Sequence, residues 1–178
     1  MTRIVALSDT HWSREALPKA VVELAAGADL IIHAGDFVSE NAYESLSKLG
    51  KLEAVCGNAD SPALKSLLPE QKVIEVEGIR IGLVHKASHG SDLVGVEMMA
   101  REMDVQVLVF GHIHRPVVEK GDRLLICPGS PTQPRMSAPS AAMLEITGGR
   151  ISGSIVPLGS PVCDYLKYAQ ELAKVSEK

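Results

Sequence analysis

The sequence predicts an α/β fold in which two β-sheets pack face to face and helices cover their outer faces. In the first half, short apolar strands alternate with helical segments, which is typical of parallel strands joined by helical crossovers. In the second half, strands flank short glycine-containing turns, which indicates antiparallel hairpins. The chain of 178 residues is 46% hydrophobic and 22% charged. This is the composition of an ordinary globular protein that can form a core without disulfides.

The first half contains three apolar runs of strand length, which cover residues 4–7, 30–33 and 52–56. A helix is predicted after each strand. The first helix is expected from near Pro18, because the fixed φ of proline suits a first helical turn. The second has Asn41 and Glu44 at the spacing of a capping box. The third is expected to have Ser61 as its N-cap and Pro62 as its first helical residue.

The second half contains three predicted hairpins, whose turns are Glu77-Gly78, Gly121-Asp122 and Gly148-Gly149. Their strands cover residues 72–76 with 79–85, 117–118 with 124–127, and 143–146 with 151–156. A helix over residues 93–103 and a strand over residues 106–110 separate the first hairpin from the second. We therefore expect one domain over residues 1–160. Residues 161–178 have apolar side chains at helical spacing, and this helix is expected either to pack on the domain or to form an oligomer contact, so a homo-oligomer stays open.

Charge and the length of apolar runs exclude several classes of partner. The chain has 18 Lys and Arg against 22 Asp and Glu, and no basic run of five or more residues, so no extensive nucleic-acid surface is expected. The longest apolar stretches span five to seven residues, far below the ~20 that cross a bilayer, so no membrane association is expected.

The three cysteines are widely spaced and odd in number, which predicts neither a disulfide framework nor a zinc knuckle: Cys56, Cys127 and Cys163. The first apolar run is a strand rather than a secretory leader, so the expected location is cytoplasmic.

Polar side chains with ligand chemistry recur where the predicted strands end. They are Asp9, His11, Asp36, Asn58, His85, His112 and His114. Because the carboxyl ends of parallel strands line the ligand crevice of an α/β sheet, we expect these residues to converge. One such residue alone would be an ordinary turn former or helix cap. Seven of them, all at strand ends and none at strand starts, are difficult to explain as independent caps.

These residue types favour divalent transition metals. Two carboxylates, one amide oxygen and four imidazoles form a mixed oxygen and nitrogen set, which suits manganese, iron, zinc, cobalt or nickel. Calcium or magnesium would prefer nearly all oxygen, and the set contains no cysteine, which disfavours a structural zinc site. Seven ligands are too many for one tetrahedral ion and about right for two ions that share a carboxylate. Paired ions about 3.5–4 Å apart are an arrangement that hydrolyses phosphoesters.

Five motifs in this order resemble those of the calcineurin-like metallophosphoesterase superfamily: Asp9-Thr10-His11, Gly35-Asp36, Gly57-Asn58, His85 after a strand, and Gly111-His112-Ile113-His114. The short chain, the Gly57-Asn58-Ala59-Asp60 variant and the segment from Pro128 to Arg135 resemble its small YfcE-like phosphodiesterase branch. The resemblance covers roughly residues 3–156. It implies a four-layer αββα sandwich of two mixed β-sheets flanked by helices, in agreement with the two-sheet prediction.

The resemblance also implies a ligand set. It places Asp9, His11 and His114 on a first metal ion, and Asn58, His85 and His112 on a second, with Asp36 bridging the two. Two divalent ions would be the cofactors, with manganese as the preferred guess and nickel, cobalt, iron or zinc as alternatives. A hydroxide held by these metals would attack the phosphorus of a small phosphodiester. We expect the catalytic residues to be Asp36, Asn58 and His89.

One position departs from the family pattern. Ala59 stands where many members have a histidine that protonates the leaving group, so we expect weak turnover of esters with poor leaving groups. His89 is either a solvated loop residue or a replacement proton donor. It is also an alternative to His85 as a ligand, although His85 is favoured because it directly follows a strand. The rival functions are a phosphomonoesterase with the same site, and a catalytically weak scaffold or partner-binding protein such as the retromer subunit that shares this fold.

Overall fold

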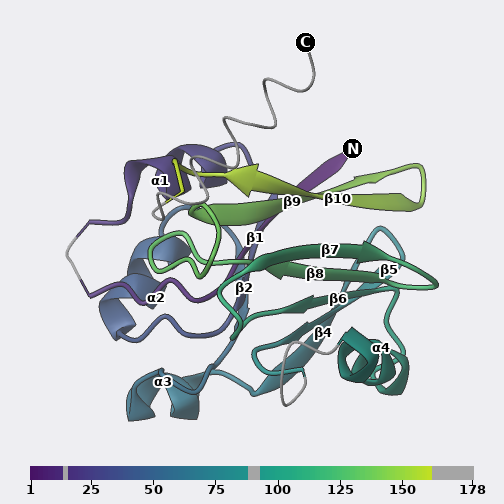
Figure 1. Ribbon diagram of the computed structural model, residues 1–178, viewed down its shortest axis with the longest axis horizontal. Helices are drawn as coiled ribbons and strands as arrows, with labels where there is room; N and C mark the ends of the chain where they lie inside the picture. The colour runs from purple at the N-terminus through teal and green to yellow at the C-terminus, as the bar shows by residue number, and fades with distance from the viewer. Residues whose placement is uncertain (14–15, 88–92, 162–178) are drawn as a thin grey trace.

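The structure, a computed structural model, describes residues 1–13, 16–87 and 93–161. These residues form two five-stranded sheets (Figure 1). The first sheet has the order β10-β9-β1-β2-β3, built from β1 (Thr2–Leu7), β2 (Leu30–Ala34), β3 (Leu52–Val55), β9 (Ser140–Thr147) and β10 (Arg150–Pro157). The second has the order β4-β5-β6-β8-β7, built from β4 (Gln71–Val76), β5 (Ile79–Val84), β6 (Val107–Phe110), β7 (Pro116–Lys120) and β8 (Leu124–Pro128).

Both sheets are mixed, as predicted. In the first sheet β1, β2 and β3 run parallel, and β9 and β10 are antiparallel to their neighbours. In the second sheet β5, β6 and β8 run parallel, while the edge strands β4 and β7 are antiparallel. The parallel strands bring their carboxyl ends to one edge of each sheet, which is where the predicted ligands follow.

Alternation of apolar side chains along the strands produces a core on each face of each sheet. Between the sheets, Ile4, Ala6 and Ile32 pack in one cluster with Ile81 and Val109. The opposite face of the first sheet packs against three helices, namely α1 (Lys19–Ala25), α2 (Glu40–Ser47) and α3 (Pro62–Leu67). The outer face of the second sheet packs against α4 (Leu93–Glu102). The layers therefore follow the predicted αββα order, and Figure 1 shows α1 and α2 on one side of the molecule and α4 on the other.

The helix starts confirm the predictions for the first and third helices and correct the predicted cap of the second. Ser61 accepts a hydrogen bond from the Leu64 N–H and so caps α3, as predicted. Asn41 was predicted as the cap of the second helix, but this was wrong, because Ser39 has extended backbone angles and its side chain accepts from the Ala42 N–H. Pro18 lies at the N-cap of α1 with a ψ of 133°, one residue before the first turn.

The hairpin turns lie where the glycines predict them. Glu77 and Gly78 join β4 to β5 with φ values of 50° and 77°, the left-handed pair that a two-residue hairpin requires.

No helix within the described ranges is long and apolar enough to cross a membrane. The predicted C-terminal helix over residues 161–178 lies, beyond residue 161, outside the described residues.

Candidate functional site

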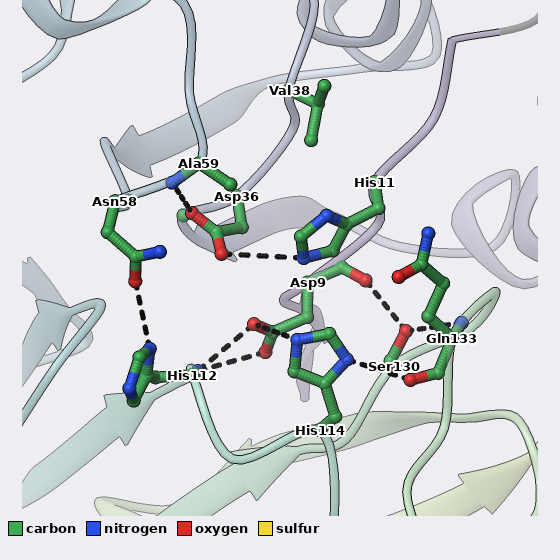
Figure 2. A network of polar contacts seen from close by, with 12 residues as sticks. Asp9, His11, Asp36, Val38, Asn58, Ala59, His112, His114, Ser130 and Gln133 are labelled. Atoms are coloured by element: carbon green, nitrogen blue, oxygen red, sulfur yellow. Dashed lines mark hydrogen bonds and ion pairs between the residues drawn. The ribbon is translucent and has the colours of Figure 1, made fainter.

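The predicted ligand residues follow five strands and meet at one place between the two sheets. Asp9 and His11 follow β1, Asp36 follows β2, and Asn58 follows β3. From the second sheet, His85 follows β5, and His112 and His114 follow β6. The loops are hydrogen bonded to each other, since the Asp9 N–H donates to Gly35 and the Gly111 N–H donates to His85. The predicted convergence is therefore present in the fold (Figure 2).

Four of these residues form a compact group. One potential ligand atom from each of Asp9, His11, Asp36 and His114 lies within 4.8 Å of the others. The His114 Nε2 atom lies 3.3 Å from Asp9 Oδ1, and His11 Nε2 lies 3.4 Å from Asp36 Oδ2. All but His11 are buried. Two buried carboxylates facing imidazole nitrogens form a strongly polar site inside the protein.

The other three residues form a second group, and Asp36 connects it to the first. The Asn58 Oδ1 atom lies 3.0 Å from His85 Nε2 and 2.9 Å from His112 Nδ1. The Asp36 Oδ2 atom lies 3.3 Å from His85 Nε2 as well as 3.4 Å from His11 Nε2. A single carboxylate oxygen thus lies between an imidazole of each group. This is the position that a bridging carboxylate requires.

Outer hydrogen bonds orient the histidines so that their lone pairs point inward. His85 Nδ1 lies 2.8 Å from the Ala34 carbonyl, and His114 Nδ1 lies 2.7 Å from the Gln133 carbonyl. A nitrogen that faces a carbonyl carries the proton, so in the neutral ring the Nε2 lone pair is directed at the site. His11 Nε2 is buried without a hydrogen bond. Several nitrogen and oxygen lone pairs therefore face one another without a proton between them. A cation bound among them would relieve this repulsion.

The separations within the site also fit ligands of a common ion. Zinc-type bonds of about 2.0–2.2 Å at roughly tetrahedral or right angles place two ligand atoms about 2.9–3.5 Å apart. The contacts between Asp36, His11, His85 and Asn58 measure 3.0–3.4 Å. The donor set of imidazole, carboxylate and amide oxygen fits a divalent transition metal.

Burial and mutual charge perturb the acids and bases of this site. Burial raises the pKa of Asp9. Burial alone would also raise the pKa of Asp36, but the hydrogen bond and charge of His85 and the Ala59 N–H outweigh it, so the pKa is lowered. For His85 burial alone would lower the pKa, but the hydrogen bond and charge of Asp36 outweigh it, so the pKa is raised. Asp36 and His85 thus stabilise each other's charged forms in the absence of another cation.

Most of these residues have an unusual backbone conformation. Positive φ values of 39–75° occur at five of the seven predicted ligands, namely Asp9, His11, Asp36, His112 and His114. Residues other than glycine rarely adopt this left-handed region, although Asp and His do so more readily than most. Val38, two residues after Asp36, has a φ of 80°. Such conformations are concentrated where a site needs side chains that regular strands cannot present.

Asp60 holds this strained backbone in place. Its carboxylate accepts hydrogen bonds from three backbone N–H groups, of Gly57 and Val38 at 2.7 Å and of Asp36 at 3.2 Å. The sequence places Asp60 where a family histidine would need an orienting carboxylate, but the structure assigns the carboxylate to the backbone. Its partners lie in two different ligand loops, and the residue type alone gives no sign of this.

Two further connections were also missed. His33 is fully buried, and its Nδ1 accepts from the Gly35 N–H at 3.1 Å while its Nε2 lies 3.2 Å from Thr10 Oγ1. Ser130 donates to the Asp9 carbonyl at 2.7 Å and accepts from the Gln133 N–H at 2.8 Å. His33 therefore joins the first two ligand loops, and Ser130 joins the first loop to the carbonyl that orients His114. The available signal in the sequence was the segment from Pro128 to Arg135, which contains Ser130 and resembles the family.

Two further positions that the sequence singles out are His89 and Ala59. His89 lies outside the described residues, so its predicted catalytic role stays a prediction. Ala59 is exposed beside the site, and its N–H donates to Asp36 Oδ1 at 2.7 Å. Its methyl group supplies no proton, as the sequence indicates.

Comparison with known proteins agrees with the motifs. A model of the calcineurin-like phosphoesterase superfamily domain matches residues 2–149. The chain belongs to this superfamily. A probable metallophosphoesterase of Methanothermobacter thermautotrophicus is 35% identical over 167 residues, which cover 91% of this chain and 96% of that protein.

Solved structures of the same fold include an archaeal phosphodiesterase and Vps29. An archaeal phosphodiesterase superposes with a TM-score of 0.68 at 23% identity, covering 87% of this chain and all of that chain. Wild-type Vps29 from Entamoeba histolytica, complexed with Zn²⁺, superposes with a TM-score of 0.71 at 21% identity, covering 89% of this chain and all of that chain. At these identities the likeness establishes the fold, which this phosphoesterase superfamily member shares with both.

Proposed function

We propose that this protein is a phosphodiesterase that depends on two divalent metal ions and hydrolyses small phosphodiesters. The observation that carries the proposal is the position of Asp36 Oδ2, which lies 3.4 Å from His11 Nε2 and 3.3 Å from His85 Nε2. One carboxylate oxygen shared between two groups of nitrogen and oxygen ligands suits a pair of ions. Membership of the calcineurin-like superfamily and the phosphodiesterase fold neighbour support the same chemistry.

The ligands divide into two sets around Asp36. Asp9, His11 and His114 would hold the first ion, and Asn58, His85 and His112 the second. Manganese is the preferred ion, and nickel, cobalt, iron and zinc suit the same donors. The Vps29 fold neighbour is complexed with Zn²⁺, which supports a divalent cation as the ligand of this fold.

When bound, two such ions would supply positive charge for the phosphoryl oxygens and lower the pKa of a water. The chain's own residues position and balance this charge. Asp9 and Asp36 contribute two negative charges, and Asn58 and the neutral imidazoles contribute none, so a site with two divalent cations would keep about two positive charges. The Ala34 and Gln133 carbonyls hold His85 and His114 in the required tautomer. A phosphodiester, with one negative charge, would be attracted without neutralising the site.

The alanine at position 59 indicates that the preferred substrates are diesters with good leaving groups. General acid catalysis contributes typically about 10²–10⁴-fold, and Ala59 cannot supply it. Ala59→His should raise kcat on diesters with poor leaving groups by roughly tenfold, below the usual range of such assistance, because Asp60 already accepts three backbone N–H groups and would not orient the new ring. Rates on a bis-aryl diester and on a dialkyl diester, from which an alkoxide must leave, would be compared. An unchanged dialkyl rate would mean that another group already donates the proton.

The proposal is tested by metal analysis combined with turnover. Purified protein would be depleted with a chelator, reloaded with Mn²⁺ and assayed on bis(4-nitrophenyl) phosphate and on 4-nitrophenyl phosphate. We expect two equivalents of metal, and a higher kcat/KM on the diester than on the monoester. Asp36→Asn should lose both metal equivalents and activity, whereas Asp29→Asn, an exposed carboxylate outside the site, should keep them. Bound metal without turnover on either ester would favour the scaffold function, and preference for the monoester would favour a phosphomonoesterase.

A further inference from the structure

A cavity of about 450 Å³ opens beside one end of the ligand cluster. It shares Asn58 and His85 with the cluster, and the rest of its wall comes from the loop after β3, from α3, from the start of β4 and the residue before it, from the end of β5 and the residue after His85, and from α4. A phosphoryl group held at the cluster would therefore direct one of its substituents into this cavity. The wall beyond Asn58 and His85 includes three charged side chains, those of Lys65, Glu70 and Lys86.

The two lysines place positive charge next to the ligand cluster. The Lys65 Nζ atom donates to the backbone carbonyl of Asn58 at 2.7 Å, which anchors the ammonium group beside this end of the site and leaves two of its N–H donors for a ligand. Lys86 directly follows His85 and is exposed. Both lysines line the same cavity as Asn58 and His85, so both ammonium groups lie at this end of the cluster. Against them stands the carboxylate of Glu70, so the described lining residues of this cavity carry one net positive charge.

The opposite end of the cluster has a different character. A second cavity of about 490 Å³ is lined by His11, Trp12, Thr132 and Gln133 together with Ser13 and two prolines. None of these described lining residues is a lysine, arginine, aspartate or glutamate. Figure 2 shows Asn58 and His112 on one side of Asp36 and Asp9, and His11 and Gln133 on the other. Among the residues that the structure describes, the two cavities thus flank the site, one lined by two lysines and one carboxylate and the other by no formally charged side chain.

We propose that the cationic cavity is a subsite for an ester arm that carries its own anionic oxygen group, either a carboxylate or a phosphate-type group. This inference rests on the proposed phosphodiesterase function. A diester has two arms, and the uncharged arm enters the second cavity beside Trp12. The difference in charge between the cavities sets the orientation of an asymmetric diester. It also makes the preferred substrate an asymmetric diester with at least two negative charges, one on the scissile phosphate and one on an arm.

Three matched substrates test this inference. Each is a 4-nitrophenyl aryl phosphate whose second ring carries, in the para position, a carboxamide, a carboxylate or a phosphonate. Release of 4-nitrophenolate reports the same bond cleavage in all three. For the wild-type protein loaded with Mn²⁺ we expect kcat/KM for the anionic diesters to exceed that for the carboxamide by roughly tenfold, the size of one charge-assisted contact discounted for solvent exposure. The larger of the two ratios identifies the carboxylate or the phosphate-type group as the preferred anion.

Lysine variants then assign the effect. Lys86→Gln and Lys65→Gln should each lower the ratio of anionic to carboxamide substrate at least about threefold, since each removes one of the two contributing charges. Lys19→Gln removes the same charge from the exposed surface of α1, where Lys19 is 89% exposed and paired with Glu23, and should leave both kcat/KM and the ratio unchanged. Equal kcat/KM values for the three wild-type reactions, or a ratio that neither cavity variant lowers, would overturn the subsite alone. Failure of the loaded protein to hydrolyse any of the three diesters would overturn the proposed function and the subsite with it.

Discussion

Replacing Asp60 by asparagine should destabilise the protein and loosen the site, although no predicted ligand is altered. Asp60 is buried, with 4% of its surface exposed. One carboxylate oxygen accepts from Gly57 and Asp36, and the other accepts from Val38. Asparagine has the same shape but a single acceptor oxygen. Whichever way the amide is turned, an N–H group of the backbone faces an NH₂ group and loses its partner.

The magnitude follows from these three hydrogen bonds. Loss of the 2.7 Å bond from Val38 to a charged acceptor costs about 1.5–3 kcal/mol. The two bonds that remain change from charge-assisted to neutral, which roughly halves their strength. The sum is about 3–6 kcal/mol, a large part of the ~5–15 kcal/mol that stabilises a typical domain.

Urea unfolding in the presence of a chelator measures this loss without a contribution from bound metal. Asp29→Asn is the matched control, because Asp29 accepts a single backbone hydrogen bond, from Arg3 at 2.8 Å, in an exposed position. It should cost less than about 1 kcal/mol. We also expect Asp60→Asn to weaken Mn²⁺ binding about 10–100-fold, as is usual when a group that orients a ligand is lost. An Asp60→Asn protein within about 0.5 kcal/mol of the wild type would refute the reasoning.

Three further changes probe the same architecture. Gly57→Ala would place a Cβ atom against the Asp36 carboxylate and should weaken Mn²⁺ binding at least about tenfold. Gly121→Ala is the control, because its Cβ atom would meet no atom within 4 Å, and it should leave Mn²⁺ binding unchanged. Calorimetric titration with Mn²⁺ measures both. Burial, with help from the charge of His85, lowers the pKa of His33 from its ordinary 6.5 to about 3. Between these two pH values the unfolded chain takes up a proton at His33 that the folded chain does not. The free energy of unfolding therefore falls as the pH falls. The wild type should therefore lose about 2 kcal/mol of its advantage over His33→Gln between pH 7 and pH 5 in chelator, and a difference independent of pH would contradict the burial argument. Val38→Gly should be more stable than Val38→Ala by about 1 kcal/mol, because only glycine adopts a φ of 80° without strain; the reverse order in urea unfolding would show that Val38 is not strained.

The sheets were predictable because their signals are local. Apolar runs of four or five residues gave the parallel strands, and the glycines at positions 78 and 149 marked hairpin turns in which they have positive φ. The cap of α2 was mispredicted for an equally local reason. Ser39 and Asn41 are both good cap residues, and the choice between them depends on which one has extended backbone angles, as Ser39 does. Tertiary contacts decide this, and the sequence does not contain them in readable form.

The site was predictable as far as residue type identifies it. Imidazoles and carboxylates directly after buried strands are conspicuous, and parallel strand topology brings them together. The supporting residues were not predictable, because their function is to accept backbone N–H groups from distant loops. The sequence places Asp60 as a carboxylate that would orient a histidine, and it does not show the three backbone N–H groups that Asp60 accepts. It allows His33 as a core histidine or as a support for the site, and it does not show that the ring accepts from the Gly35 N–H at 3.1 Å. Sequence reasoning therefore predicted the side chains that converge at the site, but not the hydrogen bonds that hold their loops in place.

This division has an energetic basis in the backbone of the ligand loops. Left-handed conformations cost a residue other than glycine about 1–2 kcal/mol, and they occur at five predicted ligands and at Val38. Glycine would remove the cost, but it has no side chain to offer a ligand. The strain must therefore be offset by interactions outside the ligand set, and the bonds made by Asp60, His33 and Ser130 lie where they do this. Loss of these bonds should be felt at the site before it is felt in the sheets, because the two sheets have their own apolar core and the ligand loops depend on polar contacts.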